Sequence, residues 1–371
     1  MVQAGKARLA NWDLLRSLSM LAVFFVHSQA FLEPVFGPRL GGMIARTAII
    51  CDPVFFSLSG YFAIRDLRGS LSEYYRKKLC TIVLPLFVFA LLLYPVSVGF
   101  SGLSLFGFIK FSSAQLIGPW WFIPTLIPCL VIAPFLAVFF EALSDKAAKL
   151  IMFAILGFSA WASVSLGLTW LFNAGGNETC SAAITVATKI IPVLPFPNTY
   201  LLYFCSGYFF RRCLPMISNK SKAGLVLLGI ASFAYDLAAK FFHIDLVDPS
   251  YQWLLATCAI FIIFDRIRIT NRLLNRIVRW TAKRSYSIYL LNLLAINIAF
   301  PFINDTILAG SFAHLSALPA FITWIIGVVL SYLIALVLAS LIDSTVLKGF
   351  QFVFTRMTDR FVANTPLKLS R

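Results

Sequence analysis

Charged residues are scarce in this sequence. Only 12% of its 371 residues are charged, about half the fraction typical of soluble globular domains. Hydrophobic residues, in contrast, make up 60% of the chain. A composition this apolar excludes an ordinary soluble enzyme, so we expect an all-α, polytopic membrane protein.

Acidic residues are rarer than basic ones: 15 Asp and Glu stand against 31 Lys and Arg, a formal net charge of +16. A basic balance can indicate a nucleic-acid-binding protein. Here, however, the basic residues lie in short connections between apolar segments, so no nucleic acid is expected as a partner. Most of them fall on one side of the membrane if the N-terminus is inside. The positive-inside rule then predicts cytoplasmic N- and C-termini for a protein of the inner (plasma) membrane.

Potential metal ligands are few and scattered. Only three histidines are present, and the seven cysteines show no CxxC pair and no metal-like spacing. This distribution argues against a disulfide framework and against structural zinc. No metal cofactor is therefore expected.

The apolar residues form long runs, and about ten of these can cross a bilayer as helices, for which roughly 20 residues are needed. They lie near residues 14–33, 43–64, 80–100, 119–141, 150–172, 198–211, 223–242, 250–265, 284–303 and 319–346. We expect the interrupted stretch 101–118 at the outer interface and the longest connection, 173–197, outside. The arginine-rich stretch 266–284 is typical of an amphipathic helix on the inner headgroups, with contact to an anionic cofactor as the alternative. We predict one transmembrane domain over 1–346 and a basic cytoplasmic tail over 347–371.

The first apolar run nevertheless contains Asp13, Arg16 and His27. Asp13 and Arg16 are three residues apart, so they share one face of a helix. Arg16 and His27 are eleven residues apart, which at about 100° per residue is three turns plus roughly 20° and places them on the same face, roughly 16 Å apart along the axis. Because ionisable groups in a membrane are costly, they usually face the protein interior or a wet cavity. This stripe is therefore our first candidate for a functional site.

His27 is the only histidine well within a predicted span. A reference pKa near 6.5 makes histidine the usual residue for general acid–base chemistry. The alternative is a structural histidine that only forms hydrogen bonds. For Arg16, the alternative to a role in anion binding is an ion pair with Asp13 that serves only structure.

The first apolar run resembles the first-helix signature of the acyltransferase-3 family of integral membrane acyltransferases. The resemblance lies in Asp13-x-x-Arg16, followed by ten residues and then His27. Other stretches resemble elements of this family, in the same order along nearly the whole chain. They are Asp52-Pro53-Val54-Phe55-Phe56-Ser57-Leu58-Ser59-Gly60-Tyr61, Tyr75-Arg76-Lys77-Lys78, Trp120-Trp121-Phe122, Phe204-Cys205-Ser206-Gly207-Tyr208 and Ser287-Ile288-Tyr289-Leu290. Their order and the spacing from Arg16 to His27 make the set specific.

Two positions depart from the family pattern. The family often has a second arginine three residues after the first in its basic motif, whereas Thr81 stands three residues after Lys78. A histidine often follows the late Ile-Tyr-Leu element closely, and here Asn292 occupies that position. An asparagine forms hydrogen bonds but cannot act as a base near neutral pH.

The resemblance implies transfer of an acyl group, often acetyl from acetyl-CoA, to a hydroxyl of a cell-surface glycan or lipid-linked sugar. His27 would be the base, with Asp13 and Arg16 beside it. Arg16 and the basic residues Arg76, Lys77 and Lys78 would hold the phosphates of acyl-CoA. Asp52, Trp120, Trp121 and Asn292 are the candidates for substrate binding.

Several of these residues have simpler interpretations. The triplet at 76–78 can be plain inner-side topology charge, and the tryptophans at 120 and 121 can belong to an interfacial aromatic belt. Asp52 can pair with His27 or with Arg46. Asp236 and Lys240, four residues apart, suit a structural ion pair.

Three functions are compatible with the sequence. The leading one is the O-acyltransferase, with membrane lipids as surroundings and a homo-oligomer left open. The second is a transporter or flippase of an acyl or sugar-lipid substrate, which would tolerate loss of a base at position 27 if polarity were kept. The third is a degenerate member acting as an interaction protein, an alternative that Thr81 and Asn292 keep open.

Overall fold

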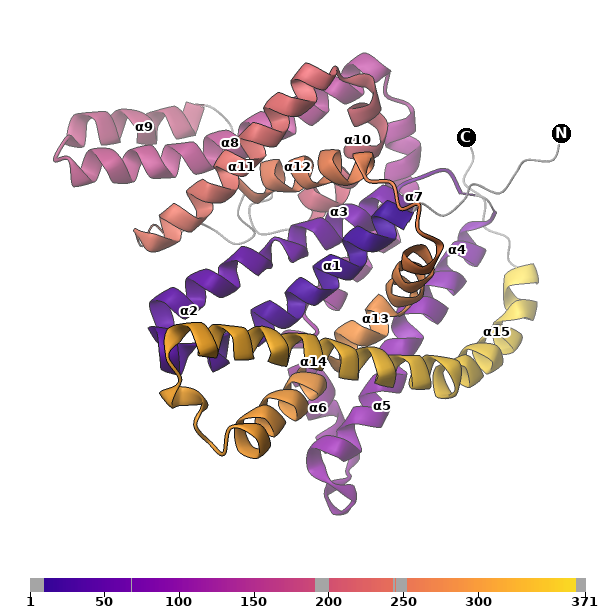
Figure 1. The fold of residues 1–371 in the computed structure, drawn as a ribbon. Helices are drawn as coiled ribbons and strands as arrows, with labels where there is room; N and C mark the ends of the chain where they lie inside the picture. Colours follow the sequence, from indigo (N-terminus) through magenta and orange to yellow (C-terminus); the bar gives the residue numbers. More distant parts are fainter. Residues whose placement is uncertain (1–9, 68, 191–199, 243, 245–251, 365–371) are drawn as a thin grey trace. The chain divides into compact units, whose positions relative to one another are not determined.

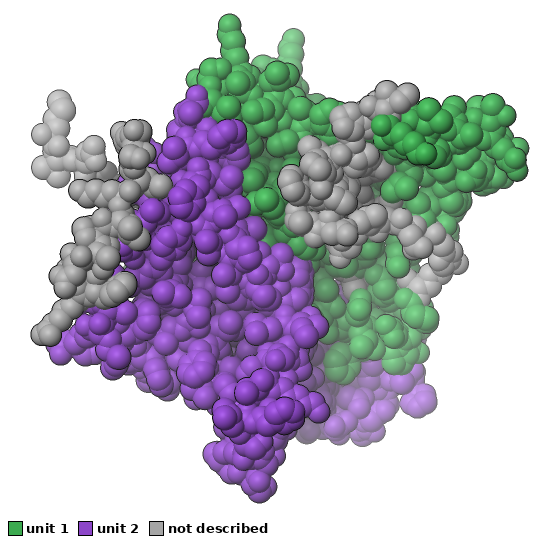
Figure 2. Space-filling model, turned by 180° about the vertical axis from the view of Figure 1, so that it is seen from behind, with its two compact units in different colours: residues 1–62, 143–283 green, residues 63–142, 284–371 purple. Residues whose placement is uncertain are grey.

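The computed structural model describes residues 10–67, 69–190, 200–242, 244 and 252–364 (Figure 1). Helices account for 88% of the described residues, and no strand occurs among them. The all-α prediction is confirmed. The chain divides into two compact units that alternate along the sequence: unit 1 comprises residues 1–62 and 143–283, and unit 2 comprises residues 63–142 and 284–371 (Figure 2).

Unit 1 contains seven complete helices among its described residues, all but the last residue of an eighth and the start of a ninth. They are α1 (Ala10–His27), α2 (Glu33–Ile49), α3 (Cys51–Ala63, whose last residue belongs to unit 2), α8 (Asp145–Ala174), α9 (Glu178–Ile190), α10 (Leu201–Cys213), α11 (Asn219–Phe241), α12 (Gln252–Arg266) and the first turns of α13 (Arg272–Pro301). Helices α11 and α12 lie side by side, and α9 pairs with α8 (Figure 1). The predicted connection 173–197 therefore contains a helix, and its residues 191–197 lie outside the described residues.

Helices α3 and α10 cross at backbone contact. A Cβ atom on Gly60 would lie 1.7 Å from the carbonyl oxygen of Phe204, and one on Gly207 would lie 1.9 Å from the carbonyl oxygen of Ser57. The Ser57 hydroxyl donates a hydrogen bond to the carbonyl of Tyr203 across the same crossing, at 3.0 Å. Small residues at such positions let helix backbones approach closely in membrane proteins.

A buried ion pair connects α2 to α11. Nε and Nη2 of Arg46 donate to the two carboxylate oxygens of Asp236, each at 2.9 Å. The Asp236 side chain is fully buried, and the Arg46 guanidinium also lies 5.6 Å from the ring centroid of Trp253. The prediction that Asp236 pairs with Lys240 is thus wrong. Lys240, four positions along the same helix, is exposed, and Asp236 pairs instead with Arg46 of another helix.

We expect Asp236→Asn to destabilise the protein by about 3 kcal/mol, because the Arg46 charge would remain largely buried without its counterion. Asp145→Asn is the matched control, since the Asp145 side chain is 63% exposed in its ion pair with Arg212 and exposed pairs contribute at most about 1 kcal/mol. Thermal unfolding of the purified protein in detergent measures both changes. Equal stability of the two variants would contradict the importance of the Arg46–Asp236 pair.

Unit 2 contains six complete helices among its described residues and most of α13. The complete helices are α4 (Leu71–Lys78), α5 (Leu84–Val98), α6 (Leu105–Ile117), α7 (Phe122–Glu141), α14 (Ala317–Ser344) and α15 (Val346–Asn364). A π turn (Leu79–Val83) joins α4 to α5, and a second one (Phe302–Ile307) follows α13. The predicted outer segment 101–118 forms the short, largely exposed α6.

The predicted basic tail is mostly helical. Helix α15 packs against α4 and α5, and the amide of Gln351 donates to the carbonyl of Cys80 at 3.2 Å. Residues 365–371 lie outside the described part of the chain. The predicted surface helix at 266–284 likewise differs from the structure, because from Arg272 onward it is continuous with the next span as α13.

Seven helical segments are long and apolar enough to span a membrane, counted over the described residues. They run over residues 40–63, 71–98, 122–141, 145–174, 219–241, 272–307 and 317–359. The other three predicted spans are also helices: α1 carries Asp13 and Arg16, whereas α10 and α12 have only 13 and 15 residues. The count of ten and the cytoplasmic termini stay predictions.

Candidate functional site

The predicted stripe lies on α1, a helix of unit 1 that packs against α2 and α12. Its N-terminal end is fixed by Asn11, whose side-chain amide donates to the carbonyl of Phe264 at 2.9 Å. Asp13 is buried, and Arg16 and His27 are half-buried. The helix therefore turns the titratable residues at least partly toward the protein, as expected for ionisable groups in a membrane.

His27 is the last residue of α1. Its imidazole ring forms no hydrogen bond or ion pair with any residue that the structure describes. A histidine with a purely structural role would be expected to use its ring nitrogens in such bonds. The ring nitrogens are therefore not used in bonds to the described part of the chain.

Asp52 does not supply a partner for this ring. Its carboxylate lies 3.4 Å from the thiol of Cys51, which donates to it. Arg46, the other predicted partner of Asp52, forms its bidentate ion pair with Asp236.

Arg16 belongs to a cluster of cations and aromatic rings. Its guanidinium carbon lies 5.5 Å from the ring centroid of Phe62, and the Phe62 ring is 5.0 Å from that of Tyr61. The guanidinium of Arg211 lies 5.9 Å from the Tyr61 ring and 5.2 Å from the Tyr208 ring. Two guanidinium groups thus lie against neighbouring rings of α3, one from α1 and one from α10.

Arg211 is not among the site residues predicted from the sequence. Its Nη1 donates to the backbone carbonyl of Tyr61 at 2.7 Å, which fixes the end of α3 to α10. Its position in the sequence could have indicated it. Arg211 follows Tyr208 by three residues and so shares a helix face with the end of the stretch 204–208.

The tryptophan element lies in unit 2, against the middle of α13. Trp120 is 2% exposed, and its indole N–H donates to the carbonyl of Leu290 at 3.2 Å. The hydroxyl of Tyr289 donates to the carbonyl of Pro119 at 2.7 Å. Trp120 is therefore a packed interior residue and not part of an aromatic belt at the lipid surface, whereas Trp121 is half-buried.

The two departures from the expected pattern have different surroundings. The hydroxyl of Thr81 donates to the carbonyl of Lys77 at 2.7 Å within the first π turn. Asn292 is 1% exposed, and its Nδ2 donates to the carbonyl of Tyr289 at 2.6 Å. Its Oδ1 has no hydrogen-bond partner among the described residues, so an acceptor remains at the position predicted to bind substrate.

The three basic residues at the end of α4 also differ from one another. Arg76 forms an ion pair with Asp359 of α15. Lys77 is exposed. Lys78 is half-buried, and its Nζ lies 5.4 Å from the ring centroid of Tyr74. The triplet is therefore not one uniform patch of charge.

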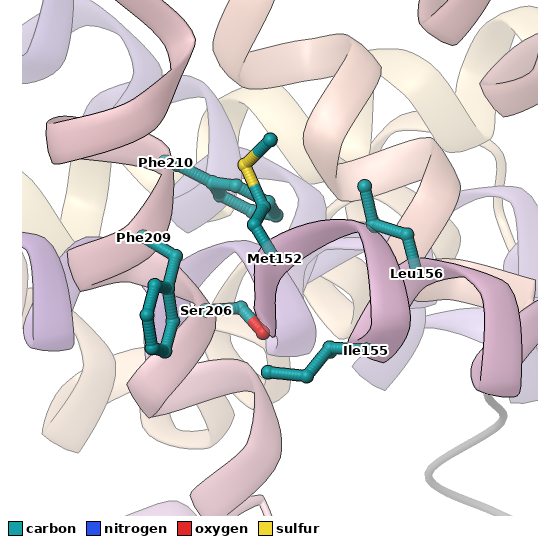
Figure 3. A pocket seen from close by; sticks show the side chains of 6 residues that line it. All are labelled: Met152, Ile155, Leu156, Ser206, Phe209 and Phe210. Atoms are coloured by element: carbon teal, nitrogen blue, oxygen red, sulfur yellow. The ribbon is translucent and has the colours of Figure 1, made fainter. Parts of the chain in front are cut away.

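A hollow in unit 1 lies between α8 and α10 (Figure 3). Met152 and Phe210 line it together with one hydroxyl, that of Ser206, which donates to the carbonyl of Leu202 at 2.7 Å. The hollow has no room for a water-sized molecule. It is a packing gap and not a substrate site.

Metal ligands do not gather anywhere in the described part of the chain: no three His, Cys, Asp or Glu side chains there are placed to hold an ion. None of the seven cysteines forms a disulfide bond.

Comparison with known proteins gives one match. A family model described as an acyltransferase domain matches residues 9–340. No curated protein and no solved structure matches the chain.

Proposed function

The chain belongs to the acyltransferase-3 family, and on this basis we propose that it is a membrane O-acyltransferase. In this proposal, the protein moves an acyl group from acyl-CoA to a hydroxyl of a cell-surface glycan or lipid-linked sugar. The first acyl group to test is acetyl. The observation that supports this chemistry most is the imidazole of His27. It lies on the same helix as Arg16 and has no hydrogen-bond partner among the described residues. A base and an anion-binding group are what acyl transfer from a CoA thioester requires.

In the proposed reaction, a neutral His27 accepts the proton of the acceptor hydroxyl as its oxygen attacks the thioester carbonyl. The carbon–sulfur bond then breaks, the acyl group stays on the acceptor oxygen, and the CoA sulfur takes the proton from the imidazolium. A two-step route through an acyl-histidine would use the same nitrogen as the nucleophile. Both routes need an unprotonated ring.

We propose that Arg16 binds the phosphates of the donor together with Arg211. Guanidinium groups bind phosphate oxygens in a bidentate manner. Both guanidiniums lie against the adjacent rings of Phe62 and Tyr61, so their positions are restricted by packing. The roughly 16 Å between Arg16 and His27 along α1 would be spanned by the arm that connects the phosphates of CoA to its thioester. The donor would arrive from the cytoplasm, in the orientation predicted by the basic residues.

The test is transfer of label from radiolabelled acetyl-CoA to envelope glycans in membranes that contain the protein. Membranes that contain the wild-type protein are expected to incorporate more label into glycan than membranes that lack the protein. Arg16→Ala is expected to raise the KM for acetyl-CoA roughly tenfold to a hundredfold, the effect of losing a hydrogen bond between charged groups, with a smaller change in kcat.

Arg272→Ala is the control, because Arg272 is an exposed arginine of the same unit. An equal KM increase in both variants would contradict the role of Arg16. Absence of labelling by wild type, together with uptake of a sugar-lipid into vesicles, would contradict the acyltransferase proposal itself.

A further inference from the structure

A second hollow, in unit 2, has the features of a binding site. It lies between α7 and the segment formed by α4 and the first π turn, and its cavity volume is about 150 Å³. This volume is below the roughly 300–1,000 Å³ of pockets that bury a whole small ligand, so the hollow has room for only part of a larger molecule. Lys78 is the one charged side chain among the described residues that line this hollow, and Leu79, Ile82, Val83 and Val131 contribute apolar walls.

The π turn helps to shape this hollow. Such turns occur frequently at functional sites, and here two side chains hold it in place. The amide of Gln351 donates to the carbonyl of Cys80 at 3.2 Å, and the hydroxyl of Tyr286 donates to the carbonyl of Ile82 at 2.8 Å. The widened turn is therefore supported on both sides by hydrogen bonds.

The opposite wall is also fixed. The hydroxyls of Tyr74 and Tyr75 donate to the carbonyls of Leu130 and Val131 on α7, at 2.8 and 2.9 Å. Residue 134 is a proline, which has no N–H to bond the Leu130 carbonyl within the helix. The Tyr74 hydroxyl takes that place, so α4 and α7 are joined where the proline leaves an acceptor available.

The hollow opens where membrane lipid is expected. Leu79, Val83 and Val131 are 46%, 38% and 47% exposed, and they belong to two of the candidate membrane spans, 71–98 and 122–141. An alkyl chain gains little by leaving the bilayer for an apolar groove, because lipid tails are as apolar as these side chains. Selectivity must therefore come from the charge of Lys78, whose Nζ lies over the ring of Tyr74.

We propose that this hollow binds an anionic phospholipid, with one acyl chain along the π turn and α7 and the phosphate at the ammonium group of Lys78. The apolar lining suits a lipid chain better than the polar nucleotide of a CoA donor. This site goes beyond the proposed acyl transfer and does not depend on it.

Native mass spectrometry of the purified full-length protein tests the proposal, with phosphatidylglycerol and phosphatidylcholine of identical chains as probes. Wild type is expected to retain the anionic lipid about fivefold more than the zwitterionic one, the effect of one lysine near an anionic headgroup. Lys78→Gln is expected to remove this preference. Lys77→Gln is the matched control and is expected to keep it, because Lys77 is exposed and does not line the hollow.

Val131→Trp would fill the hollow and is expected to reduce retention of the anionic lipid, with size-exclusion elution used to verify folding of each variant. Three results would overturn the proposal. They are equal retention of the two lipids by wild type, loss of the preference in Lys77→Gln to the same degree as in Lys78→Gln, and displacement of bound phosphatidylglycerol by coenzyme A.

Discussion

Replacement of His27 by alanine is expected to lower acyl transfer by about 10²- to 10⁴-fold, the usual contribution of a general base. An unactivated hydroxyl must lose its proton to attack a thioester, and His27 is the residue on the α1 stripe that can accept one near neutral pH. Its ring bonds to none of the described residues. The substitution therefore removes no internal hydrogen bond within that part of the chain, and the variant should remain folded.

His27→Gln separates basicity from polarity. Glutamine can form hydrogen bonds but does not accept a proton near neutral pH, so this variant should lose activity as alanine does. His314→Gln is the control, since His314 is an exposed histidine outside α1. The measurement is label transfer from acetyl-CoA at matched protein levels. Wild-type labelling by His27→Gln would show that position 27 needs polarity and not a base, as in the transporter alternative.

Gly207→Ala is expected to destabilise the protein by about 3 kcal/mol or more, at or beyond the upper end of typical overpacking effects. The added Cβ would lie 1.9 Å from the carbonyl oxygen of Ser57 and 2.7 Å from the amide nitrogen of Tyr61. Both are backbone atoms, so no side-chain rotation can relieve the contact. Helices α3 and α10 would have to move apart and break the hydrogen bond from Ser57 to Tyr203.

Gly224→Ala is the matched control in α11, because its Cβ would meet no atom within 4 Å. That variant should gain up to about 1 kcal/mol from the better helix propensity of alanine. Thermal unfolding in detergent, together with the fraction of monodisperse protein, reports both effects. If Gly207→Ala unfolds at the temperature of Gly224→Ala, the two helices do not cross in backbone contact.

This crossing also gives a physical reason for two stretches of the family resemblance. Gly60 and Gly207 each stand where a Cβ would meet the backbone of the partner helix. The sequence contained both glycines, but only the packing of α3 on α10 shows that they belong to one contact.

The sequence by itself determined the properties that depend on local geometry. The apolar runs predicted the helices, and the fixed rotation per residue of an α-helix placed Asp13, Arg16 and His27 along one face of α1. It could also have indicated the continuous α13, because neither glycine nor proline interrupts the chain between Arg272 and Pro301. The predicted boundary at residue 284 instead follows the change from a basic to an apolar segment.

Only the tertiary structure decided which groups meet across helices. The local rule of four residues favoured Lys240 as the partner of Asp236, yet the carboxylate pairs with Arg46, 190 positions away in the sequence. Arg16 of α1 and Arg211 of α10 likewise lie against Phe62 and Tyr61, which belong to a third helix. Such contacts are set by how helices pack and not by the spacing of residues along one chain segment, so periodicity carries no information about them.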